Sequence, residues 1–559
     1  MSSTAPHAPG GLEMVTLGCM QLEQMQQRIH NDAQIINRLP AELLSRIFTI
    51  GEASDRSTRP RMNWYIGFQE IVTHVCHRWR EVAIRCPTLW TYIHITRPSS
   101  YHLVSLYLGR AGSGSLLDID IEMRARFWTV VAIESHDWET QLDKVPYLLK
   151  FLISRGATVD RWRSLTVCAK QPEVLYAIIG FINAKPARAL QSISCRWKYW
   201  HQGSEIDVDE ELRSLEYPHL FSESYLFSSS MMPKLRSVEF NAVSWGYVFG
   251  RSPGPPLLTG LTNLSLTSAH FPCSASDIQN LLASNLELEH LSLSISKQAA
   301  TEFHHDIDPV PSSLHVCLPK LLSLSFSTSG GTEWVSSVLS IISAPVLRRF
   351  SIAGDFMQTL SLTNHFTGGK LLLQHEHGNI VASTEDIRPT YPLLDELDIS
   401  MLTMITEILL RMLFALPKIT KLHVGYQHIK QLNAAPHVLP NLEHIYCSWV
   451  PYRQLGDLLR RRTNAGFPIR TVHLGRAGLD HVGELLPEDV RYEYYHALDY
   501  ELDYDDSDLA SNDGLGEDED MFEDSGDDLM LMTDEVPGSS DEDDSSPSPQ
   551  ESNWMTMDN

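Results

Sequence analysis

The sequence predicts a mixed α/β protein: a small helical N-terminal domain, then an array of short repeated strand and helix units, then a disordered acidic tail. Three observations predict this: amphipathic segments between Leu39 and Trp90, a strand-forming phrase that recurs between Pro233 and Leu474, and an acid-rich C-terminus. The expected domains are residues 1–38 for an N-terminal tail and short helix, 39–97 for the helical domain, 98–490 for the repeats and 491–559 for the tail.

The helical domain begins behind Pro40. Apolar residues there recur at helical spacing, and a second stretch around Trp79 repeats that spacing. The apolar positions are Leu39, Leu43, Leu44, Ile47 and Phe48 in the first stretch, and Val75, Trp79, Val82 and Ala83 in the second. Two helices this short cannot bury all of their apolar surface against each other. We therefore expect part of that surface to remain available to a partner.

The order of residues in this domain resembles the F-box. The chain reads Leu39-Pro40-Ala41-Glu42-Leu43-Leu44-Ser45-Arg46-Ile47-Phe48, then Val75-Cys76-His77-Arg78-Trp79-Arg80, then Pro87-Thr88-Leu89-Trp90. The closing Pro-x-Leu-Trp is shared with the F-box-like proteins abundant in mushroom-forming fungi. The resemblance implies docking on a Skp-type adaptor of a cullin ubiquitin ligase. The adaptor-contact residues that it implies are Leu39, Pro40, Leu43, Leu44, Ile47, Phe48, Val75, Cys76 and Trp79.

Two features keep another interpretation of this domain open. Leu39 and Val75 are 36 positions apart, which is more than in a compact F-box. The additional stretch, Gly51–Asn63, is rich in Arg, Ser, Thr and Pro and lacks apolar periodicity, so we expect a surface loop. The segment is alternatively an ordinary helical hairpin in a larger core, with Trp79 as its most suitable core residue.

The second half of the chain repeats the phrase Pro-x-Leu-x-x-Φ-x-Φ, in which Φ is apolar. Six copies begin at Pro233, Pro319, Pro345, Pro392, Pro417 and Pro440, and three that lack this proline end at Leu266, Leu293 and Leu474. The usual step is 23 to 33 residues, and one step of 47 holds an insertion or a degenerate copy. The Φ-x-Φ alternation favours a short strand, and several intervening segments have helical periodicity.

A period in this range with Leu-x-x-Leu-x-Leu is typical of leucine-rich repeats. One unit alone cannot cover its apolar side, so we expect the units to stack into a solenoid with one long parallel sheet. Fainter copies around Ile119, Leu165 and Ile193 predict that the array starts well before Pro233. The asparagine that follows the strand in regular repeats is missing from most units, which predicts an irregular solenoid. The alternative is a set of unrelated strand and helix units.

The side chains that flank the Φ positions point away from the core, because side chains alternate across a strand. Small hydroxyls dominate the early units, and charged, imidazole and aromatic groups appear in the later ones. These larger groups give more selective contacts, so we expect target binding in the later units. The predicted target-binding residues are Arg349, Glu396, Asp398, Lys421, His423, His444, Tyr446 and His473. The alternative is a polar face that serves solubility alone.

No catalytic residue, metal or cofactor is expected. Gly368-Gly369-Lys370 lacks the first glycine and the following hydroxyl of a phosphate-binding loop, and His375-Glu376-His377 lacks the spacing of a helical metal site. The eight cysteines are scattered without a Cys-x-x-Cys pair, which predicts the reduced thiols of an intracellular protein. The chain shows no secretory signal and no membrane span. We expect a cytoplasmic or nuclear protein.

Net charge separates the tail from the body. The chain carries a net charge of −26. Residues 501–559 contain 22 acidic residues and no Lys or Arg. The other 500 residues are therefore nearly neutral, and no basic face for nucleic acid is expected. The tail has too few apolar residues to fold, and Ser525, Ser539 and Ser540 precede acids in the context that acidophilic kinases favour.

These expectations combine into one function. The resemblance implies the substrate-recognition subunit of a cullin-type ubiquitin ligase, in which the helical domain binds the adaptor and the solenoid binds an unknown target protein. The chain itself would supply no catalytic group and would bind no nucleic acid, membrane or small-molecule substrate. The alternative is a leucine-rich-repeat scaffold that has no link to ubiquitin transfer.

Overall fold

The computed structural model describes most of the chain before residue 495. The described residues are 22, 25–31, 33–58, 67–96, 101–123, 138–169, 172–197, 230–241, 243, 258–268, 275–295, 315–328, 332–356, 361–367, 373–376, 379–382, 390–447, 450, 452–475 and 490–494. Contacts divide the chain into Met1–Ala497 and Leu498–Asn559, so every described element belongs to the first unit. The acidic tail with Ser525, Ser539 and Ser540 lies outside the described residues.

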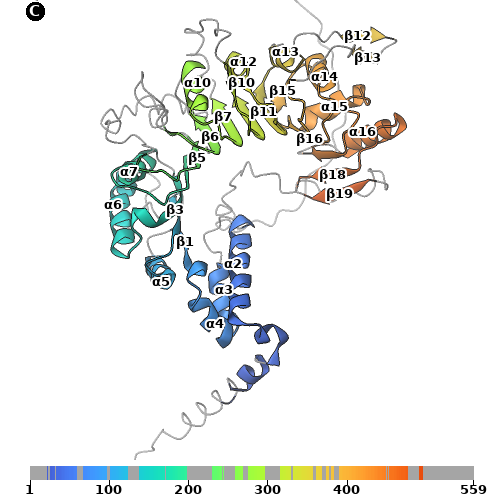
Figure 1. Ribbon diagram of the computed structural model, residues 1–559. Coiled ribbons are helices and arrows are strands. Elements are labelled where there is room, and N and C mark those ends of the chain that lie inside the picture. The colour runs from blue at the N-terminus through green and yellow to red at the C-terminus, as the bar shows by residue number, and fades with distance from the viewer. Residues whose placement is uncertain are drawn as a thin grey trace, which may run out of the picture. The chain divides into compact units, whose positions relative to one another are not determined.

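The N-terminal part of the described chain is helical (Figure 1). Its elements are η1 (Ile35–Arg38), α2 (Ala41–Thr58), α3 (Phe68–Val75), α4 (His77–Ile84) and η2 (Pro87–Trp90). Helices α2, α3 and α4 all contact one another, and α2 also contacts η2. Their shared core contains the fully buried Leu44, Phe48, Val72, Ala83 and Trp90. Trp90 donates from Nε1 to the Ala83 carbonyl at 2.8 Å, which fixes η2 against α4.

The expectation of a surface loop over Gly51–Asn63 is wrong for its first part. Helix α2 continues to Thr58, and residues 59–66 lie outside the described residues. Gly51 sits against the Phe68 ring so closely that a side chain there would collide with it. An ion pair stabilises this last part of α2: Arg56 lies 2.8 Å from Glu52, which is one helical turn earlier.

A fifteen-stranded sheet follows within the described residues. Fourteen strands form one path in the order of the sequence, and every pair in it is parallel. They are β1 (Tyr92–Ile95), β2 (Leu117–Met123), β3 (Trp162–Ala169), β4 (Ser192–Trp197), β5 (Ser237–Asn241), β6 (Asn263–Ser268), β7 (His290–Ile295), β9 (Ser323–Thr328), β11 (Arg349–Asp355), β14 (Glu396–Asp398), β16 (Lys421–Val424), β17 (His444–Cys447), β18 (Thr471–Leu474) and β19 (Arg491–Tyr494). The short β15 (Leu402–Thr403) pairs with β11.

The repeated phrase sets the register of this sheet. Equivalent Φ residues are paired strand to strand, as Leu324 with Phe350 and Leu422 with Ile445. These Φ side chains are buried, while most residues between them remain partly exposed; His473 and Ser194 are exceptions, each only 8 % exposed. The mixed α/β class and the long parallel sheet are thus confirmed. In the faint copy near Ile119, Leu117 is fully buried and Leu116 is exposed. The pairing of β2 with β3 shifts register between Leu117 and Asp118.

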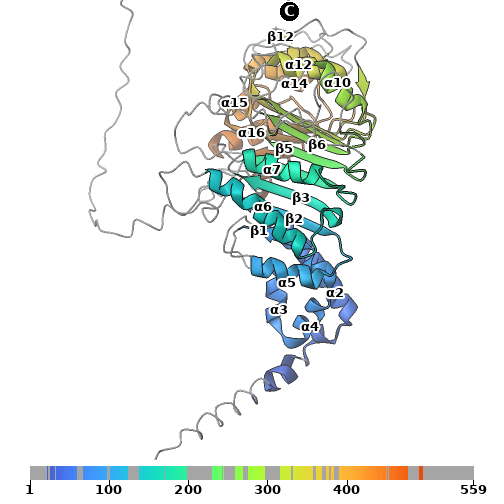
Figure 2. The same cartoon turned by 90° about the vertical axis from the view of Figure 1, so that its left-hand side faces the viewer.

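Helices connect most of the strands and lie along one side of the sheet (Figures 1 and 2). They are α5 (Tyr101–Ala111), α6 (Trp138–Ser154), α7 (Pro172–Asn183), α10 (Ala275–Ala283), α12 (Thr332–Ile341), α13 (Ser361–Thr367), α14 (Thr406–Phe414), α15 (Tyr426–Ala434) and α16 (Tyr452–Asn464), with the single turn η5 (Val159–Arg161) before β3. From α10 to α16, each described helix contacts the next one. The core therefore runs continuously between the sheet and this layer of helices.

The long repeat step holds an insertion rather than a degenerate copy. Between β11 and β14 lie α13 and an antiparallel hairpin of β12 (Leu373–Glu376) and β13 (Asn379–Ala382), which is separate from the main sheet. A second small sheet pairs β8 (Val316–Cys317) with β10 (Ile342–Ser343).

Two expected domain boundaries do not coincide with the ends of the main sheet. Strand β1 lies inside the region assigned to the helical domain, and β19 lies inside the region assigned to the tail. Among the described residues, no helix combines the length and the apolar character needed to cross a bilayer.

Candidate functional site

An exposed apolar patch lies on the helical part of the chain. It consists of Leu43, Ile47 and Ile50 on α2 and of Ile71 and Val75 on α3, each at least 42 % exposed. On α2 these residues recur at positions i, i+4 and i+7, so they share one face of the helix. The neighbouring face carries the buried Leu44, Phe48 and Glu52. Helix α2 thus has one stripe in the core and a second apolar stripe in solvent.

The nine predicted adaptor-contact residues divide between these two stripes. Pro40, Leu43, Ile47 and Val75 are exposed, and Leu39, Cys76 and Trp79 are half-buried. Leu44 and Phe48 are fully buried, so neither is placed for direct contact with a partner. Sequence periodicity alone did not separate the two stripes, because both are apolar.

Trp79 belongs partly to the core, as its indole is fixed on two sides. Its ring lies 5.0 Å from that of Phe48, and its Nε1 donates to Oδ1 of Asn37 at 2.6 Å. Cys76 caps α4 by accepting from the Trp79 backbone N–H at 3.5 Å. These contacts fix the start of α4 beside Val75, the last residue of α3, and so hold the patch residues on a rigid support.

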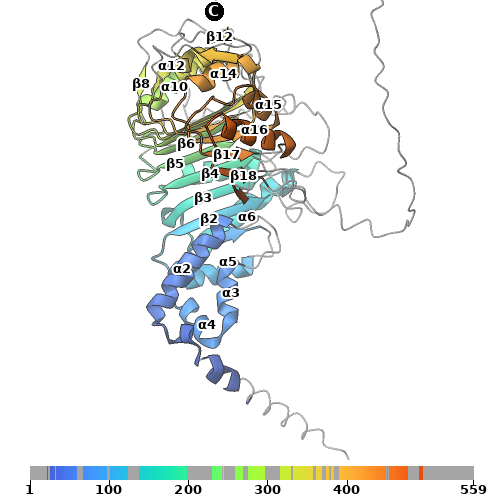
Figure 3. The ribbon, with the colours of Figure 1, turned by 90° about the vertical axis from the view of Figure 1, so that its right-hand side faces the viewer.

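A second candidate surface lies on the face of the sheet opposite the helices (Figure 3). Its centre is a stack of three rings, which we call the ring stack: His423 on β16, Tyr446 on β17 and His473 on β18. The centroids of His423 and Tyr446 are 4.1 Å apart and those of Tyr446 and His473 are 4.0 Å apart, with interplanar angles of 4° and 5°. The three residues are register partners on adjacent parallel strands, which places their side chains side by side.

A carboxylate closes each end of the ring stack. Glu396 on β14 lies 3.4 Å from Nε2 of His423, and Glu493 on β19 lies 3.3 Å from Nδ1 of His473. The hydrogen bond from His423 lowers the pKa of Glu396 below its ordinary value, against the opposing effect of burial. Burial lowers the pKa of His473, while the charge of Glu493 acts to raise it.

The remaining predicted target-binding residues surround this stack. Asp398 is the register partner of His423, and Lys421 lies 3.8 Å from Glu396. His444 places Nδ1 at 3.4 Å from Nε2 of His473, and Arg349 pairs in register with Glu396. The structure therefore brings all eight predicted residues together over five strands, β11 to β18.

Sequence reasoning missed the last strand of this surface. Glu493 and Arg491 on β19 lie in the region assigned to the tail, and Arg491 pairs with Glu493 at 2.8 Å. The available signal was the alternation Arg491-Tyr492-Glu493-Tyr494 after Val490, which is typical of a strand at a sheet edge.

Among the described residues, neither surface gathers a set of side chains that could hold a metal ion. Over the described part of the chain, no three His, Cys, Asp or Glu side chains are placed to hold one metal ion. Gly368–Lys370 and His377 lie outside the described residues. Both surfaces instead offer contact area, apolar on the helices and aromatic and charged on the sheet.

The sequence matches no family model, and the curated proteins contain no match to it.

Proposed function

We propose that this chain is the substrate-recognition subunit of a cullin-type ubiquitin ligase. In this proposal the F-box-like helices bind a Skp-type adaptor and the sheet binds a target protein. The observation that carries it is the apolar patch, because Leu43, Ile47 and Val75 remain exposed at positions where the F-box resemblance implies adaptor contact. Exposed apolar side chains that recur along one face of a helix are typical of a binding surface.

The sheet supports the second half of the proposal. We interpret it as an irregular leucine-rich-repeat solenoid, since its strands are stacked in sequence order and the repeated phrase is in register throughout. The ring stack offers a tyrosine, two imidazoles and charged neighbours, which are the groups that give selective contacts with a protein. Tethering a target near the conjugating enzyme raises its effective concentration, so the chain needs no catalytic group of its own.

Adaptor binding is tested by co-purification with a Skp-type adaptor. We expect Leu43→Asp with Ile47→Asp to abolish recovery of the adaptor, because both charges enter the exposed stripe without disturbing Leu44 and Phe48. The matched control is Leu286→Asp with Leu393→Asp, which alters two comparably exposed leucines outside the helical part and should retain the adaptor. Failure of the unaltered chain to recover any adaptor would contradict the proposal and favour the scaffold function.

Target binding is tested by proximity labelling in cells. We expect Tyr446→Ala with His423→Ser to remove specific labelled proteins, while Ser292→Ala with Ser265→Ala on the hydroxyl-rich part of the same face leaves them. Equal labelling by both variants would show that the ring stack is not the recognition surface.

A further inference from the structure

Given the proposed adaptor binding, on which this step rests, we propose that the adaptor also contacts a short helix that precedes the F-box-like helices. This helix covers residues 25–31, and residue 22 is helical as well. Its apolar side chains, Leu22, Met25 and Ile29, are each at least 61 % exposed. We call these three residues the N-terminal stripe.

The N-terminal stripe lies along one side of its helix. Its three residues stand at positions i, i+3 and i+7, which place side chains on one helical face. The other described residues of this helix before Asn31 are polar and exposed: Gln26, Gln27, Arg28 and His30. An amphipathic helix with apolar anchors at this spacing is the form in which a helix binds a groove of another protein. A helix this short is marginal alone in water, so a partner that covers its apolar side also stabilises it.

One buried side chain fixes this helix to the F-box-like part. Asn37 is only 7 % exposed; its Nδ2 donates to the Asn31 carbonyl at 2.7 Å, and its Oδ1 accepts from Nε1 of Trp79 at 2.6 Å. The indole N–H only donates and the carbonyl only accepts, so this orientation of the amide is the one that satisfies both. Asn37 therefore joins the end of the N-terminal helix to α4.

The connection between the N-terminal helix and α2 is fixed at its other end too. Arg78 on α4 donates from Nη2 to the Leu39 carbonyl at 2.7 Å, just before α2 begins. Exposed apolar residues also continue through this connection at every seventh position: Leu22, Ile29, Ile36, Leu43 and Ile50. The last two belong to the apolar patch. The N-terminal stripe and the apolar patch are therefore held on one support, α4, and are available to the same partner.

The size of the apolar patch indicates that an adaptor needs more surface than the patch supplies. A standard protein interface buries about 800 Å² on each partner, of which about 450 Å² is apolar. The five patch residues are about half exposed and supply on the order of 300 Å², at about 30 Å² for each carbon atom. The N-terminal stripe adds on the order of 200 Å². Together they reach the apolar area of a standard interface.

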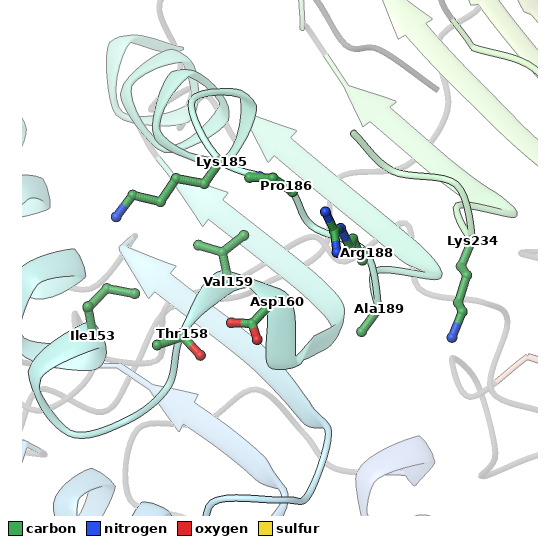
Figure 4. A pocket seen from close by; sticks show the side chains of 9 residues that line it. All are labelled: Ile153, Thr158, Val159, Asp160, Lys185, Pro186, Arg188, Ala189 and Lys234. Carbon is green, nitrogen blue, oxygen red and sulfur yellow. The ribbon is translucent and has the colours of Figure 1, made fainter. Parts of the chain in front are cut away.

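A pocket near the start of β4 does not offer a comparable binding surface. Its lining includes Lys185, Arg188 and Lys234, whose side chains point apart, and the Asp160 carboxylate belongs to the same lining (Figure 4). These charged groups do not converge on one ligand. The N-terminal stripe differs from the pocket because its three side chains share one face of a helix.

Calorimetric titration of the full chain with a purified Skp-type adaptor tests the role of the N-terminal stripe. We expect Ile29→Asp to weaken adaptor binding by about tenfold or more, because a carboxylate replaces an apolar side chain that the complex buries. The matched control is Gln27→Asp, which adds the same charge at an exposed polar position of the same helix and should bind normally.

The titrations separate this step from the proposed function. Equal affinity of Ile29→Asp and Gln27→Asp would overturn the role of the stripe and leave adaptor binding by the apolar patch intact. The role would also be overturned if the chain is dimeric and Ile29→Asp makes it monomeric at unchanged adaptor affinity, because a second copy would then cover the stripe. No binding by the unaltered chain would overturn the proposed function together with this step.

Asn37→Asp tests whether Asn37 acts by positioning the N-terminal helix. The aspartate still accepts a hydrogen bond from Trp79 but cannot donate one to the Asn31 carbonyl. We expect adaptor binding to weaken by a factor similar to that of Ile29→Asp, with little further loss when the two changes are combined, because both remove the same contact. Fully additive losses in the double variant would show that Asn37 does not act through the stripe.

Discussion

Arg56 donates from Nη1 to Oδ2 of Asp118 at 2.8 Å, and this ion pair joins the last part of α2 to the second strand of the sheet. Asp118 also accepts from Nε of Arg163 at 2.9 Å and from the Ser164 hydroxyl at 2.7 Å. Burial acts to raise the pKa of Asp118, but these hydrogen bonds outweigh it and hold the pKa below the ordinary value. The helical part is thus tied to the sheet by charge.

Replacing Arg56 with Met should destabilise the protein by about 1 to 3 kcal/mol, because the buried Glu52 carboxylate loses its bidentate partner. Urea denaturation measures the change. Arg46→Met on an exposed position of the same helix is the control and should change stability by less than about 0.5 kcal/mol. The double variant Glu52→Gln with Arg56→Met should lose less unfolding free energy than the two single variants added together. An equal loss would show that Glu52 and Arg56 are not coupled.

The ring stack predicts opposite effects of two neighbours on His473. Burial holds the pKa of His473 below its ordinary value. The charge of Glu493 acts to raise this pKa, and the charge of His444 acts to lower it. We therefore expect Glu493→Gln to lower the His473 pKa further and His444→Gln to raise it. NMR titration of the imidazole ring protons measures both values. Shifts of the same sign in the two variants would refute the arrangement of the stack.

His365 predicts acid sensitivity of the folded state. Burial lowers its pKa to about 4 from an ordinary value of 6.5. The unfolded chain therefore takes up a proton at higher pH than the folded chain, and stability falls as pH drops from about 6.5 towards 4. The contribution is about 3 kcal/mol at most.

Replacing His365 with Gln should flatten the dependence of unfolding free energy on pH in this window, and a slope unchanged from the unaltered chain would contradict the assignment. His102→Gln, at an exposed position on α5, is the control and should leave the slope as it is.

Arg462 predicts a large stability loss from a single substitution. Its side chain is only 1 % exposed, and it donates to the carbonyls of Phe467, Pro436, Val438 and Leu439. Arg462→Met leaves these buried acceptors without a donor and should cost about 3 kcal/mol. Thermal unfolding measures it, with Arg461→Met on the exposed side of α16 as the control. Near-equal effects of the two changes would show that the carbonyl contacts do not stabilise this turn.

The sequence predicted the sheet well because one signal was repeated. Each copy of the phrase is ambiguous alone, but copies in register determine which residues are buried, and hence which ones face outward at the ring stack. The same logic predicts from the sequence alone that Glu396, His423 and His473 share one surface.

Other features depend on partners far away in the chain. The helix over residues 51–58 has no apolar periodicity and is supported by Asp118, which is 62 positions from Arg56. Arg462 stands beside Arg460 and Arg461 in the sequence, and its burial depends on carbonyls from the connection before β17. Local pattern cannot report such contacts.

The strictly sequential strand order has a consequence for synthesis of the chain. Each strand of the main path hydrogen-bonds to the one that precedes it on this path, so its template has already left the ribosome when it emerges. The protein can therefore gain structure from β1 onward while translation continues, with no need to wait for its C-terminus. A nascent chain stalled after β9 should already hold protected amides in its completed strands.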